Sequence, residues 1–326
     1  MARRSDAESR RLDEAAQAGW LYYVAGNTQD EIAKKMGVSR QSAQRMVSLA
    51  VSERLIKVRL DHPIARCMQL SLRLKDRFRL QACEVVPSDP ADPSSIVGLA
   101  QAGAAEMERH LKSSESQILA IGTGRALRAC ADQLAPMDCP QHHIVSLLGN
   151  MMTDGSASAY NVVVRMADLI KAKHYPMPLP VLARTPKEKD ILHNLEPIHN
   201  ILELARRADA TFVGIGNLGE KSPVVLDGFV TAREMKALEK AGAIGEIISW
   251  VYDRDGKLVD HPVNDRVASA PLQPNSSKPV YGIAAGESKV GAILGALRGK
   301  LINALITNEH TAELLLTRDQ AATAPD

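Results

Sequence analysis

From residue 118 onward, short apolar runs alternate with segments of helical periodicity. The apolar runs are ILAIG, IVSLLG, PVLA, ATFVGIG, IGEIISWVY, PVYGIAA and LINALIT, and segments such as ALRACADQL, IHNILELARRA and TAREMKALEKAG separate them. A chain with this rhythm folds as an open, largely parallel sheet with helices on both faces. We therefore predict a doubly wound α/β domain in which a ligand would bind at the carboxyl ends of the strands.

The length of 326 residues exceeds that of one ordinary domain and favours a small module joined to a larger one. We place the boundary near residue 60, which gives domains over 1–60 and 61–326. A helical connector is predicted over 61–80. The run VVPSDPADPSS at 85–95 contains three prolines and several turn residues, which predicts a surface loop within the second domain.

Composition excludes several classes of protein. Apolar residues make up 45% and charged residues 24%, as in ordinary globular proteins, and no apolar stretch is long enough to span a bilayer. The N-terminal MARRSDAESRRLDEAA lacks the apolar core of a secretory signal. We predict a cytoplasmic protein without a membrane span. Its cysteines have neither disulfide-framework nor zinc spacing, so we predict free thiols and no metal at Cys67, Cys83, Cys130 and Cys139.

Charge is distributed unevenly along the chain. Residues 1–80 contain 16 basic and 9 acidic side chains, whereas the rest contains 24 basic and 29 acidic ones. Such a split suggests that the N-terminal part meets a polyanion. A basic surface that is merely solvated is the alternative.

The first 40 residues carry clear helix boundaries. Residues 8–25 have helical spacing of apolar side chains, and the following Gly-Asn dipeptide offers a stop. Thr28 and Glu31 form a capping-box pair that begins a second helix, and Gly37 ends it. A third helix is predicted from Arg40 to Glu53.

This spacing is typical of a helix-turn-helix, whose second helix enters the major groove of DNA. On the third helix the outward arginines would bond guanine and the glutamines adenine, whereas Thr28, Lys34 and Ser39 would hold phosphates. The predicted DNA-binding residues are Thr28, Lys34, Ser39, Arg40, Gln41, Ser42, Gln44 and Arg45. A small helical interaction domain without nucleic acid is the alternative.

The segment from Leu55 to Leu60 alternates apolar and basic residues, as a small wing strand does. In that position Lys57 and Arg59 would lie beside the DNA backbone.

Four glycine-rich turns follow apolar runs of the larger domain, at Gly122–Arg125, Gly149–Asn150, Gly214–Gly219 and Ala285–Lys289. In the first turn, backbone amides and a helix N-terminus would offer a site for an anion or a hydroxyl group. In the last turn, Lys289 could meet a phosphate or hydroxyl group. The alternative is that glycine serves close packing and that Lys289 is solvated, but convergence on one sheet edge favours a site.

The turn at 214–219 also matches the dinucleotide motif G-x-G-x-x-G. The irregular segment KSPVVLDGFV follows it, with no immediate helix to receive a pyrophosphate. We predict neither nucleotide binding nor any other cofactor.

At this point the chain resembles the SorC branch of the SorC/DeoR sugar-binding transcriptional regulators over nearly its whole length. The resemblance rests on WLYYVAGNTQDEIAKKMGVSRQSAQRMVSLA at 20–50, VGIG at 213–216, GAIGEI at 242–247, YDRDG at 252–256 and AAGESKVGAILGALRGKLINALITNEHTA at 284–312. It implies a homotetramer that binds operator DNA, with an effector domain similar to sugar-phosphate isomerases and glucosamine-phosphate deaminases. The effector site that it implies comprises Gly122, Thr123, Gly124, Arg125, Glu246 and Lys289.

Three positions depart from the family pattern. Ala126 stands where a threonine is usual, and Glu246 and Asn308 each replace an aspartate. Alanine at 126 removes a hydroxyl group that could donate to a phosphate. The departure favours an unphosphorylated sugar or a polyol such as sorbitol or mannitol over a sugar phosphate.

The alternative function is an enzyme of the isomerase or deaminase type, given the similar fold and the carboxylates of Asp253, Asp255 and Glu287. Isomerisation needs a general base poised at a substrate carbon. The sequence has no clustered acid and base residues, and His142 and His143 are typical of structural histidines. We predict a regulator without catalytic residues, in which effector binding shifts the subunit packing and hence operator affinity.

Overall fold

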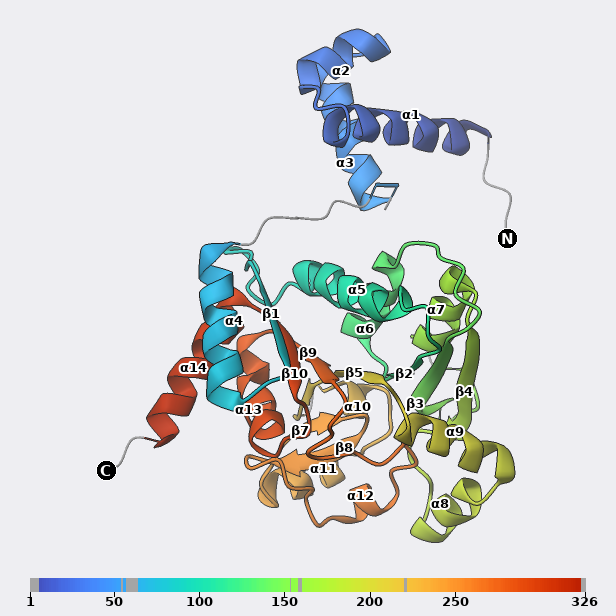
Figure 1. Ribbon diagram of the computed structural model, residues 1–326, viewed down its shortest axis with the longest axis vertical. Coiled ribbons are helices and arrows are strands. Elements are labelled where there is room, and N and C mark those ends of the chain that lie inside the picture. Colours follow the sequence, from blue (N-terminus) through green and yellow to red (C-terminus); the bar gives the residue numbers. More distant parts are fainter. Residues whose placement is uncertain are drawn as a thin grey trace. The chain divides into compact units, whose positions relative to one another are not determined.

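The structure is a computed structural model that describes residues 6–53, 55–56, 64–152, 154–157, 160–219 and 222–323. The chain divides into two compact units, Met1–His62 and Pro63–Asp326 (Figure 1). Each unit has its own hydrophobic core.

The first unit contains three helices, α1 (Asp6–Tyr23), α2 (Gln29–Met36) and α3 (Arg40–Ser52), close to the predicted ranges. Small residues allow α1 and α3 to pack closely, because a Cβ at Gly19 would lie only 2.8 Å from the Cβ of Ala50. The buried side chains of this unit include Ala15, Ala18, Ile32, Ala43, Val47 and Ala50.

The local signals for α2 and α3 behave as predicted. The Thr28 side chain accepts the N–H of Glu31 and the Glu31 carboxylate accepts the N–H of Thr28, which completes the capping box. Gly37 ends α2 in the left-handed conformation, with φ of 67°. Ser39 caps α3 by accepting the N–H of Ser42. Of the predicted wing, 55–56 form a bend, and 57–60 lie outside the described residues.

The second unit is built on a seven-stranded sheet in the order β1-β10-β9-β5-β2-β3-β4, in which all pairs are parallel. The strands are β1 (Ala82–Val86), β2 (Ile118–Ile121), β3 (His143–Met151), β4 (Lys173–Pro180), β5 (Ala210–Gly214), β9 (Val280–Ile283) and β10 (Ala304–Asn308). This confirms the predicted doubly wound class.

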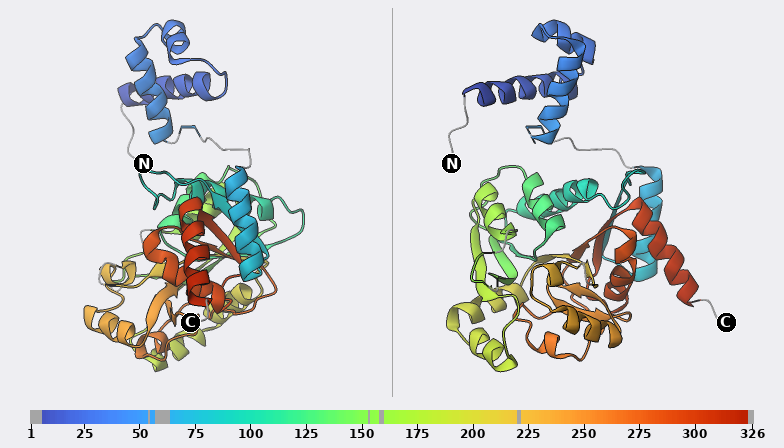
Figure 2. Two further views of the ribbon diagram at one scale, coloured as in Figure 1. Left: turned by 90° about the vertical axis from the view of Figure 1, so that its left-hand side faces the viewer. Right: turned by 180° about the vertical axis from the view of Figure 1, so that it is seen from behind.

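Helices cover both faces of this sheet (Figures 1 and 2). One core is formed with α5 (Val97–Leu111), α6 (Arg125–Gln133) and α7 (Val162–Ile170). The other is formed with α4 (Ala65–Phe78), α9 (Glu196–Arg206), α13 (Val290–Arg298) and α14 (Glu309–Thr323). The remaining helices are α8 (Pro186–His193), α10 (Pro223–Leu226), α11 (Ala232–Lys240), α12 (Pro262–Asp265) and the 3-10 turn η1 (Glu287–Lys289).

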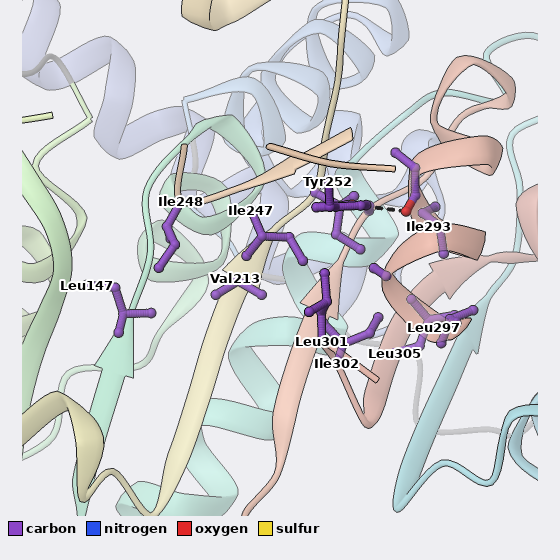
Figure 3. Packing of buried hydrophobic residues seen from close by; sticks show 14 of the residues in the cluster. Leu147, Val213, Ile247, Ile248, Tyr252, Ile293, Leu297, Leu301, Ile302 and Leu305 are labelled. Carbon is purple, nitrogen blue, oxygen red and sulfur yellow. Dashed lines mark hydrogen bonds between the residues drawn. The ribbon is translucent and has the colours of Figure 1, made fainter. Parts of the chain in front are cut away.

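A small antiparallel sheet, β6 (Gly216–Asn217), β7 (Ala243–Ile247) and β8 (Trp250–Asp253), packs on the second face. The run IGEIISWVY, predicted as one strand, therefore folds back on itself. Ile248 and Ser249 make the turn with φ of 46° and 71°. Tyr252 reaches α13, where its hydroxyl group donates to the carbonyl of Ala292 at 3.0 Å (Figure 3).

One predicted strand of this unit was wrong, and three elements were not predicted. PVLA at 180–183 is not a strand of its own. It follows β4, whose sequence KHYPMPLP holds three prolines and was not predicted as a strand. Its place at the sheet edge explains why it tolerates them. Neither β1 nor α5 was predicted. By contrast, residues 87–96 form the irregular loop that their prolines indicate.

The four cysteines are free thiols, as predicted, and three of them are buried. Among the described residues, no group of histidine, cysteine, aspartate or glutamate side chains could hold a metal ion. No helix in the described ranges is long and apolar enough to cross a membrane.

Candidate functional site

The exposed face of α3 carries the residues predicted to read DNA. Gln41, Gln44 and Arg45 are exposed, as is Arg40 in the first turn. Ser42 departs from its predicted outward position, because it is half-buried and its hydroxyl group lies 2.9 Å from that of Ser39. It stabilises the start of the helix and is not freely presented.

The cationic side chains of this surface differ in whether they form an ion pair. The Arg40 guanidinium lies 3.4 Å from the Asp30 carboxylate on α2. Arg45 has no ion pair within the described ranges, and Lys34 is exposed on α2. Thr28 and Ser39 keep their hydroxyl groups at the helix starts, next to N–H groups that attract a phosphate. Of the two arginines predicted to read DNA, Arg45 is thus the one without an ion pair in the part of the chain that the structure describes.

In the second unit, a cavity of about 650 Å³ opens at the carboxyl ends of β2, β3, β5 and β9. From β2 the chain builds outward through β3 and β4, and it then adds β5, β9 and β10 on the other side. The cavity lies at this reversal of strand order, where open α/β sheets bind ligands. Its volume is within the range of small-molecule sites.

The sequence-predicted effector residues come together in this cavity, as the sheet rule requires. Thr123, Gly124, Arg125, Glu246 and Lys289 line it. The sixth residue, Gly122, lines an adjoining smaller hollow instead.

Two glycine turns deliver helix N-termini to the cavity. Gly124 precedes α6 with φ of 109°, and Gly286 precedes η1 and α13 with φ of 116°. Neither helix start has a side-chain cap. Their first-turn N–H groups are therefore available to the oxygen atoms of a ligand.

Lys289 and Glu246 bring opposite charges to the cavity wall, and both are partly buried. The Lys289 ammonium donates to the carbonyl of Ile215 at 2.8 Å, and the Glu246 carboxylate accepts the N–H of Ser249 at 2.8 Å. Burial raises the pKa of Glu246, against the effects of the Ser249 N–H and of Lys289. Burial lowers the pKa of Lys289, with Glu246 opposing and Arg125 adding to the shift.

Gly216 has a specific steric role at this pair. It lies opposite Glu246 in the β6–β7 pairing, and a Cβ at Gly216 would lie 2.0 Å from the Glu246 carboxylate oxygen. This glycine of the G-x-G-x-x-G match thus makes room for a carboxylate. No long helix follows the motif directly, since α10 has four residues. The absence of nucleotide binding at this motif stays a prediction.

Sequence reasoning missed several polar residues of the wall. They are Asp92, Ser94, Ser95, Asn217, Asp227, Ser249 and Ser288. The 92–95 group belongs to the loop after β1, where the Asp92 carboxylate accepts the Ser94 hydroxyl group at 2.6 Å. A correct assignment of β1 would have placed this loop at the same sheet edge.

The residues weighed for catalysis are dispersed. The Asp253 carboxylate accepts the backbone N–H groups of Asp255 and Lys257 in the β8 turn, and neither aspartate lines the cavity. His142 is fully buried, where it accepts the N–H of Gln117 and contacts the Leu111 carbonyl at 3.0 Å. Of the three carboxylates considered, Glu287 alone lies in the cavity wall.

Replacement of Glu246 by glutamine should stabilise the fold at neutral pH by about 1 kcal/mol, because it removes a partly desolvated charge. The folded state raises the pKa of Glu246 and so binds its proton more tightly than the unfolded state does. The advantage of the variant is thus absent at a pH below the ordinary carboxyl pKa and grows as pH rises through the folded-state pKa. Urea unfolding at pH 4 and pH 8 measures it, and an equal gain at both would contradict this account.

Residues 62–317 match the family described as "Putative sugar-binding domain". The chain belongs to this family. It is 29% identical to the erythritol catabolism regulatory protein EryD of Brucella abortus, over 93% of this chain and 96% of EryD. It is 28% identical to the transcriptional regulator LsrR of Escherichia coli O157:H7, over 93% of this chain and 94% of LsrR.

A solved structure extends the likeness to nearly the whole chain. The full-length sorbitol operon regulator SorC of Klebsiella pneumoniae superposes with a TM-score of 0.68 and 26% identity, over 94% of this chain and 99% of SorC. The sugar-binding family member described here is accordingly a transcriptional regulator of the SorC/DeoR type.

Proposed function

We propose that this regulator binds operator DNA through α3 and an unphosphorylated polyol or sugar in the sheet-edge cavity, and so controls a carbohydrate or polyol catabolic operon. The regulator acts in the cytoplasm as a homotetramer, and the ligand changes its operator affinity. Two relatives are named for erythritol catabolism and for the sorbitol operon, which supports a polyol.

The chemistry of the cavity wall carries the choice of a neutral ligand. The described wall residues include four carboxylates and two cations. The carboxylates are those of Asp92, Asp227, Glu246 and Glu287, and the cations are Arg125 and Lys289. Hydroxyl groups both donate and accept, so a polyol can satisfy carboxylates, ammonium and backbone N–H groups together. A phosphate dianion accepts only, and the carboxylates repel it.

Ala126 supports the same choice. It lies in the cavity wall within the first turn of α6, where a hydroxyl group would add a donor for a phosphate. Its methyl group adds no donor to the N–H groups of the helix start, and the hydroxyl oxygen atoms of a polyol can accept from those groups.

A thermal-shift panel tests the ligand class. Erythritol, sorbitol and mannitol are compared with erythritol 4-phosphate and sorbitol 6-phosphate on the full chain. We expect one free polyol to raise the melting temperature, because a ligand at 100 times its Kd adds about 2.7 kcal/mol to the free energy of unfolding.

The phosphorylated compounds should raise the melting temperature less than the free polyol. A shift produced by a phosphate ester alone would overturn the neutral-ligand proposal. We also propose that the cavity has no catalytic role. Chromatographic separation followed by mass spectrometry, after incubation with sugar phosphates and amino-sugar phosphates, should detect neither isomer nor deaminated product.

A further inference from the structure

We propose that α14 couples the cavity to α4, the first helix of the second unit, and that Arg77 and Asp319 position α4 in response to the ligand. The inference rests on the proposed function, since it takes the cavity as the effector site. It assigns the coupling to a continuous set of contacts between named residues.

The first half of α14 is attached to the turns that form the cavity wall. The Thr311 hydroxyl group accepts the N–H of Gly286 at 2.9 Å. At the strand end just before α14, the Asn308 side chain donates to the carbonyl of Pro93 at 2.7 Å, within the 92–95 loop. Asn308 and Thr311 are buried, so a shift of either turn would act directly on this helix.

Just beyond its middle, α14 makes a further contact with the cavity wall. The Arg318 guanidinium lies 2.9 Å from the carboxylate of Glu287, which lines the cavity. The next residue, Asp319, points away from solvent and its side chain is 5% exposed. Adjacent residues of α14 therefore contact the cavity wall and the protein interior.

Helix α4 is attached to α14 near both of its ends. In its first turn, Arg66 pairs with Glu309 at 2.8 Å and with Glu313. In its last turn, Arg77 lies 2.7 Å from Asp319. The pairs run in the same order along both helices, which are therefore parallel and lie side by side (Figures 1 and 2). Between the ion pairs the helices share one apolar core.

A second route from the cavity reaches the same carboxylate. Helix α13 begins immediately after Lys289 and ends at Arg298, whose guanidinium lies 2.8 Å from Asp319. The lysine end of α13 is in the cavity wall, and its arginine end shares Asp319 with Arg77. Both routes from the cavity therefore meet at residues 318–319.

The Asp319 carboxylate is buried, and separating a buried charge from its partners is costly, so Arg77 and Arg298 are held against it. Packed helices respond to ligands by shifts of about 1–2 Å between discrete arrangements. Movement of the Gly286–Lys289 turn would accordingly displace α14 and α13 together, and Asp319 would carry the displacement to Arg77. Helix α4 is the first helix of the second unit, so it is the element of this unit nearest in sequence to the DNA-binding helices.

The test measures operator affinity of the full chain with and without saturating erythritol, on a DNA fragment that the wild type has selected from a random library. Arg77→Gln removes the ion pair, Arg77→Lys retains the charge, and Arg254→Gln is a matched control at an 83% exposed arginine. Fluorescence anisotropy gives the operator Kd, and titration calorimetry gives the erythritol Kd.

We expect erythritol to change the wild-type operator Kd at least tenfold, and Arg77→Gln to reduce that change to less than twofold. The erythritol Kd should stay within twofold in every variant, and Arg77→Lys should restore most of the response. A full response in Arg77→Gln would overturn the coupling, as would erythritol that binds the wild type without altering operator affinity.

Failure of erythritol to bind the wild type would count against the proposed ligand, and a ligand-free measurement then decides the coupling. Glu287→Gln breaks the contact with Arg318 and leaves every contact of α4 in place. We expect amide exchange in residues 65–78 to accelerate at least twofold in this variant and to remain unchanged in Arg254→Gln. Unchanged exchange in Glu287→Gln would overturn the proposal.

Discussion

Lys289→Met should weaken polyol binding about 30- to 100-fold. The ammonium is partly buried in the cavity wall, and a hydrogen bond from a charged group is worth about 1.5–3 kcal/mol, a range that includes this loss of affinity. Methionine has a similar length and fills the same space, so the fold should persist. Titration calorimetry with the polyol that gives the largest thermal shift measures the loss.

Lys240→Met is the matched control, because it removes an exposed lysine at the end of α11. It should leave the polyol Kd within twofold. If Lys289→Met bound the polyol as tightly as the wild type does, the ligand would lie elsewhere, and the assignment of the cavity as effector site would be lost.

Arg45→Ala should weaken operator binding about 10- to 100-fold. Its guanidinium is exposed on the outer face of α3 and has no ion pair among the described residues, and loss of a bidentate guanine contact costs about 1–3 kcal/mol. Anisotropy titration on the selected operator measures the effect.

Substitution by lysine separates the two ways in which Arg45 could bind. Arg45→Lys should rescue a phosphate contact but not a bidentate base contact, and relaxed preference at one base pair would identify the latter. Arg254→Ala, in the second unit, serves as the control. Unchanged affinity and unchanged salt dependence in Arg45→Ala would remove this residue from the DNA-reading surface.

Local chemistry explains why the first unit could be predicted closely. Each helix boundary there is formed by residues that lie close together in the sequence. They are the Thr28–Glu31 capping box, the left-handed Gly37 and the Ser39 cap, so a short stretch of sequence suffices to predict them. Ser42 shows the limit of a helical projection. A position that faces outward by periodicity is half-buried here because the neighbouring cap residue, Ser39, contacts it.

In the second unit, the missed elements depend on distant partners. Helix α5 contains glycines that weaken its periodic signal, and at Gly103 a Cβ would lie 2.4 Å from the sulfur of Cys130 on α6. Glycine at this position allows α6 to pack closely against α5. The local sequence pattern does not reveal such a contact between helices. The turn at Ile248 and Ser249 likewise uses left-handed conformations that β-branched and hydroxyl residues seldom adopt.

The cavity was predictable to the extent that topology fixes it. Parallel strands bring their carboxyl ends to one edge, so the turns at Gly124 and Gly286 had to converge once the sheet order was assumed. Asp227 was not predictable, because it comes from an irregular segment whose path depends on packing against the small sheet. The opposition of Glu246 to Gly216 depends on strand register, which periodicity does not define.

The prolines of β4 also affect whether copies of the protein can aggregate through this edge of the sheet. Pro176, Pro178 and Pro180 occupy every second position, and alternate residues of a strand direct their backbone groups to the same side. From Pro176 to Pro180 these positions therefore offer no amide donor to an incoming strand, which would find only a short ladder to extend. At the opposite edge β1 exposes Glu84, whose charge would oppose a dry pairing. Both edge strands of the seven-stranded sheet thus disfavour the strand addition that begins aggregation.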